Sequence, residues 1–220
     1  MEQKTFDLQR YLKEGWALFT ANAANLVVAT LILLAVQFAA SYIPLAGLLV
    51  SGPMMGGMFY VIFDLMEGKG FAPARMFDGF KKFVPLVLVG ILTGIFTGLG
   101  FLLLILPGFL VAGWYIFSYL LVVDEDLDFW PAMEKSRAIG FENHLNVFLL
   151  VLVLMVVNLI GVLAIGVGLL VSIPLTFCIT VKAYEDIVGI KSISLAAPAP
   201  TSFAPPPPPP PPPPSPVNPQ

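Results

Sequence analysis

Residues 143–181 read NHLNVFLLVLVLMVVNLIGVLAIGVGLLVSIPLTFCITV, a run of 39 residues without Asp, Glu, Lys or Arg. A membrane-spanning helix needs roughly 20 apolar residues, so this run is long enough for two helices and a tight turn. From Val147 to Ile165, 15 residues are Leu, Ile, Val or Phe. At about −0.3 to −0.6 kcal/mol each, they favour insertion by roughly 4–9 kcal/mol, which is enough to carry Asn158 into the bilayer. The stretch therefore predicts a membrane hairpin.

Two further charge-free runs have the same character. They comprise the 49 residues between Glu14 and Asp64 and the 41 residues between Lys82 and Asp124. Turn-forming residues interrupt each of the three runs near its middle, at 41–44, at 106–108 and at 161–168. We therefore predict an all-α integral membrane protein with six transmembrane helices as three hairpins, each preceded by an interfacial amphipathic helix. The predicted spans are 23–42, 46–65, 84–104, 109–126, 146–163 and 168–187.

The composition excludes several classes of protein. Apolar residues make up 58% of the chain and charged residues 11%, against about 25% charged in soluble domains. A net charge of −3 gives no basis for nucleic-acid binding. A single cysteine and a single histidine exclude an internal disulfide framework and argue against zinc or triad chemistry. We therefore expect no nucleic-acid partner, no cofactor, no metal and no enzymatic activity.

The positive charges predict the orientation. Every Lys and Arg lies in the N-terminal segment, in the loops 64–82 and 124–142, or near the C-terminal end, whereas the three opposite turns carry no charge. The positive-inside rule then places both termini in the cytoplasm, in a multi-pass protein of the cell membrane, and we expect the plasma membrane of a prokaryote. The sequence is compatible with a Leu106-Pro107-Gly108 turn at the outer face of the membrane or slightly below it. A re-entrant hairpin that does not cross the bilayer is the alternative.

The three charge-free runs suggest a repeat. Residues 1–193 form the predicted membrane domain, with hairpin units 5–65, 74–126 and 128–187 closed by Asp64, Asp124 and Asp186. Such units would be parallel repeats around an axis near the membrane normal. The alternative is that any chain of hairpins looks periodic.

Three stretches of the sequence carry a family resemblance. They are MFDGFKKFVPLVLVGIL (76–92), LPGFLVAGWYIFSYLLVVDEDLDFWPAMEKSRAI (106–139) and GVGLLVSIPLTFCITVKAYEDI (166–187). In these the chain resembles families of bacterial polytopic membrane proteins of unknown function, and it is similar to the membrane domain attached to some glycerophosphodiester phosphodiesterases. In those enzymes the catalytic residues belong to a separate soluble barrel, so the resemblance implies a membrane module and transfers no catalytic residue.

Regularly spaced glycines mark two of the predicted spans. They are Gly52 and Gly56 in the second span and Gly90, Gly94 and Gly98 in the third. Glycine every fourth residue removes side chains from one stripe and lets another helix approach closely. We interpret these residues as helix-packing positions. The alternatives are a homo-oligomer contact or the lining of a pore.

Charged residues near the predicted inner face have two interpretations each. The acidic run Asp124-Glu125-Asp126, with Asp128 nearby, could hold a hard cation such as Mg²⁺, or it is the solvated end of a helix. Five basic residues lie at the level of lipid headgroups and could attract anionic lipids, although the positive-inside rule alone explains them. These are Lys13, Lys81, Lys82, Lys135 and Arg137.

Residues 194–220 form a proline-rich tail, which we predict to be disordered and cytoplasmic. Its ten consecutive prolines should form a polyproline II rod of roughly 31 Å that docks on a partner protein or acts as a spacer. They are Pro205, Pro206, Pro207, Pro208, Pro209, Pro210, Pro211, Pro212, Pro213 and Pro214.

The predicted spans hold no ionisable residue in their cores, whereas transporters and proton relays usually do. Our first functional hypothesis is therefore a non-catalytic scaffold or accessory subunit that contacts membrane lipids and engages a cytoplasmic or membrane protein through the tail. The alternative is a small transporter or lipid-handling protein for a neutral or amphiphilic substrate. An enzyme acting at the headgroup layer is a third hypothesis, which rests only on the acidic run.

Overall fold

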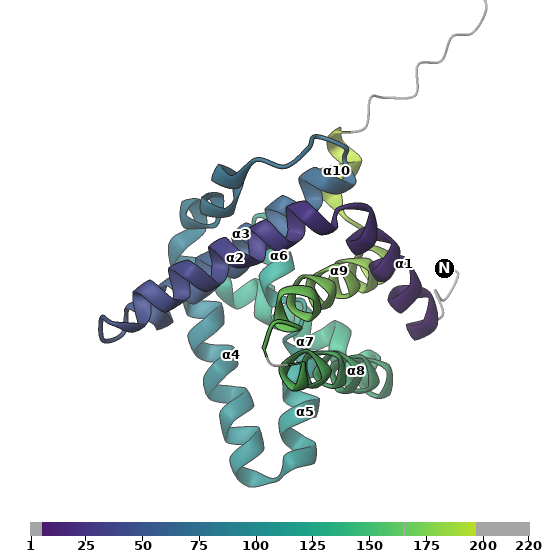
Figure 1. Ribbon diagram of the computed structural model, residues 1–220. Coiled ribbons are helices and arrows are strands. Elements are labelled where there is room, and N and C mark those ends of the chain that lie inside the picture. The colour runs from purple at the N-terminus through teal and green to yellow at the C-terminus, as the bar shows by residue number, and fades with distance from the viewer. Residues whose placement is uncertain (1–5, 165, 197–220) are drawn as a thin grey trace, which may run out of the picture.

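The computed structural model describes residues 6–164 and 166–196, and these residues form helices without any strand (Figure 1). The all-α part of the prediction is thereby confirmed. The predicted polyproline rod at 205–214 lies outside the described residues. In chain order the helices are α1 (Leu8–Ala21), α2 (Ala23–Ser41), α3 (Ala46–Met66), the 3-10 helix η1 (Pro73–Lys82), α4 (Phe83–Leu103), α5 (Ile105–Trp114), α6 (Ser118–Glu125), α7 (Phe129–Glu142), α8 (His144–Leu163), α9 (Leu169–Ile187) and α10 (Lys191–Ala196).

Five helical stretches are long and apolar enough to cross a membrane. They are α2, α3, η1 with α4, α5 with α6, and α8. The sixth predicted span corresponds to α9, which is not among these five although it has 19 residues. It differs because Lys182, Glu185 and Asp186 lie in its last two turns. The described chain is therefore an all-helical, multi-pass membrane protein with five clear candidate spans.

The tips of the hairpins expose large apolar side chains. Tyr42 is 73% exposed between α2 and α3, Leu102 is 82% exposed at the end of α4, and Leu163 is 74% exposed at the end of α8. The α4–α5 hairpin projects away from the rest of the molecule at the bottom of Figure 1. Contiguous apolar surface of this kind is rare on soluble monomers, whereas lipid covers it without penalty.

The chain reverses between α4 and α5 earlier than predicted. The extended residue is Leu104, and Leu106, Pro107 and Gly108 already belong to the first turn of α5. A proline is tolerated there because a backbone N–H in the first turn has no intrahelical acceptor. The predicted turn at Leu106-Pro107-Gly108 was therefore wrong in position. The predicted span 109–126 is also interrupted, because residues 115–117 form a turn between α5 and α6.

The second helix of each hairpin forms the core. Met54, Met58 and Ile62 of α3 are almost fully buried, as are Leu120 and Leu121 of α6. The same holds for several residues of α9, whereas α2, α4 and α8 keep most of their side chains at the surface. The hairpins thus have an inner and an outer helix.

A recurring contact joins the segment before each hairpin to an inner helix. Helix α1 lies against α9, η1 against α3, and α7 against the region of α5 and α6. Each of these segments has a polar residue four positions before a glycine. The three pairs are Tyr11 with Gly15, Arg75 with Gly79, and Ser136 with Gly140.

The glycine of each pair allows a close backbone approach. A Cβ added to Gly15 would lie 2.9 Å from the Cα of Ile179, and one added to Gly140 would lie 2.6 Å from the Cα of Trp114. A Cβ on Gly79 would lie only 1.9 Å from the carbonyl oxygen of Pro53. No larger residue fits these positions without moving a helix, since the atoms met are backbone atoms.

The polar residue of each pair bonds to the same inner helix. The Tyr11 hydroxyl donates to Asp186 at 2.6 Å, and the Arg75 Nε donates to Asp64 at 2.7 Å. The Ser136 hydroxyl donates to the carbonyl oxygen of Trp114 at 2.8 Å. Burial and the bond to Asp186 raise the pKa of Tyr11, so the hydroxyl stays protonated and remains a donor at neutral pH. We call these three contacts the latches.

Candidate functional site

A cavity of about 580 Å³ lies between the hairpins. Its walls come from α3, α4, α8 and α9 and from the interrupted segment of α5 and α6. Among the described residues, the lining contains no Asp, Glu, Lys, Arg or His. Most of the lining is apolar, and six hydroxyl groups supply the polar part. These hydroxyls belong to Thr93, Thr97, Tyr115, Tyr119, Thr176 and Thr180.

The glycine stripe of α4 forms one wall of this cavity. A Cβ added to Gly94 or Gly98 would meet nothing within 4 Å, whereas one added to Gly90 would lie 2.8 Å from the Tyr119 hydroxyl. Within this chain, Gly94 and Gly98 are therefore not at a close helix contact, contrary to the packing interpretation. Both glycines lie exposed on α4.

The glycines of α3 behave differently. A Cβ added to Gly52 would lie 2.3 Å from the carbonyl oxygen of Leu86, and one added to Gly56 would lie 2.6 Å from a Leu86 methyl group. Both glycines are buried between α3 and α4. At these two positions small residues accompany close packing of α3 against α4.

Two hydroxyl groups of the cavity are free to bind a ligand. Thr93 donates to the Val89 carbonyl at 2.6 Å and Thr180 to the Thr176 carbonyl at 2.8 Å, so both are used within their own helices. The Thr97 and Tyr115 hydroxyls make no hydrogen bond to any residue that the structure describes. A ligand with one or two hydrogen-bonding groups would match this lining.

The half-buried amide of Asn158 is used between helices and does not line the cavity. Its Nδ2 donates to the Leu154 carbonyl at 2.9 Å and to the Thr176 hydroxyl at 2.8 Å, and its Oδ1 accepts from the Ser172 hydroxyl at 3.2 Å. These bonds join α8 to α9. Polar side chains commonly join helices in this way inside a bilayer.

The acidic run is a junction between helices. Glu125 is paired with Lys135 at 2.6 Å and Lys191 at 3.1 Å, and its side chain is only 5% exposed. Asp124 accepts from the Tyr184 hydroxyl at 3.0 Å and from two backbone N–H groups that begin α10. The interpretation as a solvated helix end was therefore wrong for these two residues, because neighbouring helices cover and bind them.

The outer members of the acidic run also have structural partners. Asp126 is paired with Lys82 at 2.6 Å, and Asp128 accepts from the backbone N–H of Phe129 at the start of α7. No group of three or more potential metal ligands occurs within residues 6–164 and 166–196. The carboxylates of the run are thus committed to lysines and helix ends in this structure.

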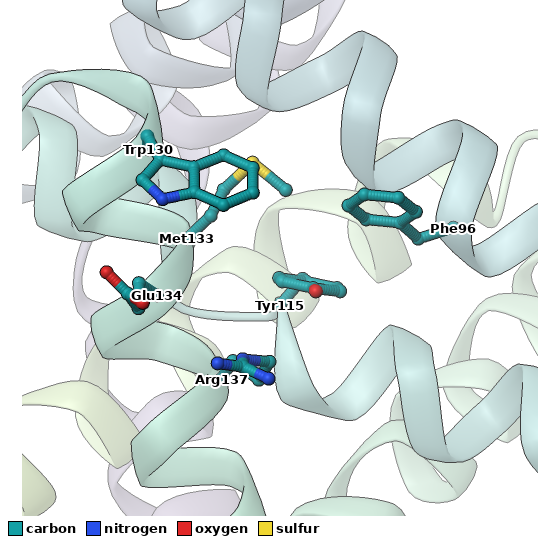
Figure 2. A pocket seen from close by; sticks show the side chains of 6 residues that line it. All are labelled: Phe96, Tyr115, Trp130, Met133, Glu134 and Arg137. Carbon is teal, nitrogen blue, oxygen red and sulfur yellow. The ribbon is translucent and has the colours of Figure 1, made fainter.

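Arg137 of α7 borders three smaller hollows outside the central cavity. Figure 2 shows the first, a pocket of about 160 Å³ between α7, Phe96 of α4 and Tyr115. The other two have volumes of about 430 and 330 Å³. The sequence placed Arg137 at the headgroup level but gave no reason to distinguish it from Lys135 two residues earlier.

Comparisons with models of known protein families, with curated proteins and with solved structures gave no match. The function is therefore inferred from the geometry of this chain.

Proposed function

We propose that the chain is a lipid-handling membrane protein that binds a neutral or amphiphilic molecule in the central cavity. The observation that carries this proposal is the cavity itself, which has the size of known ligand pockets, roughly 300–1,000 Å³. Its lining without Asp, Glu, Lys, Arg or His favours an uncharged ligand, since a charged group would be desolvated there without a partner of opposite charge. The free hydroxyls of Thr97 and Tyr115 would orient one polar group of the ligand.

The ligand would enter from the bilayer. Gly94 and Gly98 are exposed on α4, and this helix belongs to a candidate membrane span. The cavity wall that they form therefore faces lipid. A lipid with a small neutral head, such as a diacylglycerol, combines the required apolar body with a hydroxyl group.

The proposal includes the predicted topology. Helix α9 would be the sixth span, because Lys182 is paired with Glu185 at 2.7 Å and Asp186 is paired with Arg10 of α1, and these ion pairs offset the charges of its last turns. Both termini would be cytoplasmic in a prokaryotic plasma membrane. Two of the latches support the proposed repeat of three hairpin units, since Asp186 and Asp64 close their units at corresponding positions and both accept from the segment that packs on them, whereas the third latch uses the Trp114 carbonyl.

Filling the cavity tests the proposal. We expect Gly94→Leu to weaken binding of a fluorescently labelled diacylglycerol at least tenfold in detergent micelles, because the leucine side chain would occupy the lipid-facing wall. The matched control is Gly47→Leu on α3, since a Cβ at Gly47 also meets nothing within 4 Å but lies outside the cavity. Fluorescence titration measures both affinities. Absence of saturable binding by the unmodified protein, or equal binding by both variants, would contradict the proposal.

A scaffold function is the second candidate, and the ten consecutive prolines favour it. Polyproline II helices dock on aromatic grooves with little loss of entropy. If the tail is a docking element, truncation after Ala196 removes a specific protein from the material copurified from native membranes, as measured by mass spectrometry. Identical sets of proteins with and without residues 197–220 would leave the tail as a spacer.

A further inference from the structure

The surface around Arg137 has an unusual combination of charges. Among the described residues, Lys13 and Arg137 are the only Lys or Arg side chains without an ion pair or hydrogen bond. Lys135, on the same helix as Arg137, is already held by Glu125. Arg137 is exposed and therefore available to an external anion.

Two carboxylates border the same surface. Glu134 lines one pocket together with Arg137, and Glu142 lines the adjacent one. Neither carboxylate forms an ion pair with a residue in the described ranges, and Figure 2 shows the Glu134 and Arg137 side chains apart from each other. One free cation flanked by two free carboxylates matches a zwitterion better than it matches a simple anion.

An apolar groove extends from Arg137 along the α4–α5 hairpin. This groove has a volume of about 330 Å³ and is lined by Leu99, Leu103, Pro107 and Val111. Leu99 is 53% exposed and Leu103 is 77% exposed, and both lie in a candidate membrane span. The groove therefore offers an apolar surface to an acyl chain on the membrane side of the charged groups.

Aromatic side chains surround the point where the charged surface meets the groove. Phe96 and Tyr115 stack with ring centroids 5.7 Å apart, and Trp130 closes the pocket on the side of α7 (Figure 2). Their rings add apolar surface beside Arg137. They also provide faces that attract an ammonium group.

We propose that this surface binds one phospholipid whose headgroup carries a phosphate and a primary ammonium, as in phosphatidylethanolamine. The phosphate would accept hydrogen bonds from the Arg137 guanidinium, and the ammonium would pair with Glu134 or Glu142. One acyl chain would lie in the groove between α4 and α5. This site is distinct from the central cavity, although Tyr115 borders both, and it does not depend on the function proposed for the cavity.

Native mass spectrometry with palmitoyl-oleoyl phosphatidylethanolamine, phosphatidylglycerol and phosphatidylcholine tests the assignment. We expect the protein to retain one phosphatidylethanolamine at a concentration at least tenfold lower than either of the other lipids requires. Arg137→Gln should remove this preference. The matched control is Lys13→Gln, because Lys13 is the other exposed, unpaired cation of the described residues but lies on α1 and does not line the groove.

The carboxylates are tested separately. The double variant Glu134→Gln with Glu142→Gln should shift the preference toward phosphatidylglycerol, since the remaining site has a net positive charge. Protection of the buried Cys178 from a thiol reagent checks that each variant is folded. Gly94→Leu should leave phosphatidylethanolamine binding unchanged, which separates this site from the central cavity. Preferential binding of phosphatidylglycerol by the unmodified protein, or equal binding of all three lipids, would overturn the proposal, as would an Arg137→Gln variant that behaves like the unmodified protein.

Discussion

Gly57→Ala is expected to destabilise the protein by about 3 kcal/mol, the upper part of the range for overpacked cores. A Cβ at Gly57 would lie 1.8 Å from the carbonyl oxygen of Met76, and Gly79 faces α3 from the opposite side of the same contact. The obstructing atoms are backbone atoms of η1, so rotating a side chain cannot relieve the clash. Helix α3 and η1 would have to separate.

The natural reporter for this experiment is Cys178, the only cysteine of the chain, which is fully buried on α9. Its reaction with a thiol-specific dye during heating follows unfolding in detergent. Gly98→Ala is the matched control, because it adds the same methyl group to a helical glycine with nothing within 4 Å. This control should be neutral or slightly stabilising, since alanine favours a helix over glycine by about 0.5–1 kcal/mol. Equal melting temperatures for the two variants would refute the close contact between α3 and η1.

Glu125→Gln is expected to destabilise the protein by about 1.5–3 kcal/mol, the range for hydrogen bonds to charged groups. The substitution keeps the shape of the side chain but removes the charge that holds Lys135 and Lys191. The side chain of Glu125 is 5% exposed, so water cannot fully replace the lost interactions. The two lysines are 39% and 60% exposed, and their access to water keeps the effect below that of a fully buried ion pair.

Asp126→Asn is the comparison for Glu125→Gln within the same acidic run. The Asp126 side chain is 87% exposed, and its ion pair with Lys82 is therefore screened by solvent. We expect a change within about 0.5 kcal/mol. Dye labelling of Cys178 against temperature measures both variants side by side. If Asp126→Asn destabilises the protein more than Glu125→Gln, the acidic run does not join α6 to α7 and α10 as the structure has it.

The positions of the long apolar helices could be predicted from the sequence because membrane insertion depends on long charge-free runs. The 39-residue run after Glu142 becomes most of α8 and α9, and the predicted break at 161–168 contains the observed one. The interruption of α5 and α6 at 115–117 was not predictable, because Tyr, Ile and Phe there lack any helix-breaking signal.

The distinction between inner and outer helices also could not be predicted. In water, a polar face marks the outside of a helix, but lipid tails are as apolar as the protein core. Met58 of α3 and Leu102 of α4 are equally apolar in sequence, yet one is fully buried and the other is 82% exposed. Which apolar residues of these helices are buried therefore has to be determined from the three-dimensional arrangement of the helices.

The candidate sites could not be predicted from the sequence for a similar reason. The spacing of Gly90, Gly94 and Gly98 indicates where side chains are missing, but it does not say whether a helix or a cavity occupies the space. Arg137 and Lys135 look equivalent along the chain, and only the contact of Lys135 with Glu125 shows that Arg137 is the available one of the two. In both cases the deciding information is a neighbour distant in the sequence.

The latch between Tyr11 and Asp186 joins residues 175 positions apart and connects the first helix to the last long one. Because ribosomes add about 5–20 residues per second, Asp186 is synthesised roughly 9–35 s after Tyr11. During that interval the face of α1 that carries Tyr11 and Gly15 lacks the surface it later occupies on α9. The contact between α1 and α9 therefore forms late in biogenesis. In a nascent chain stalled before α9, the face of α1 that later contacts α9 would be accessible to the chaperones and proteases of membrane quality control.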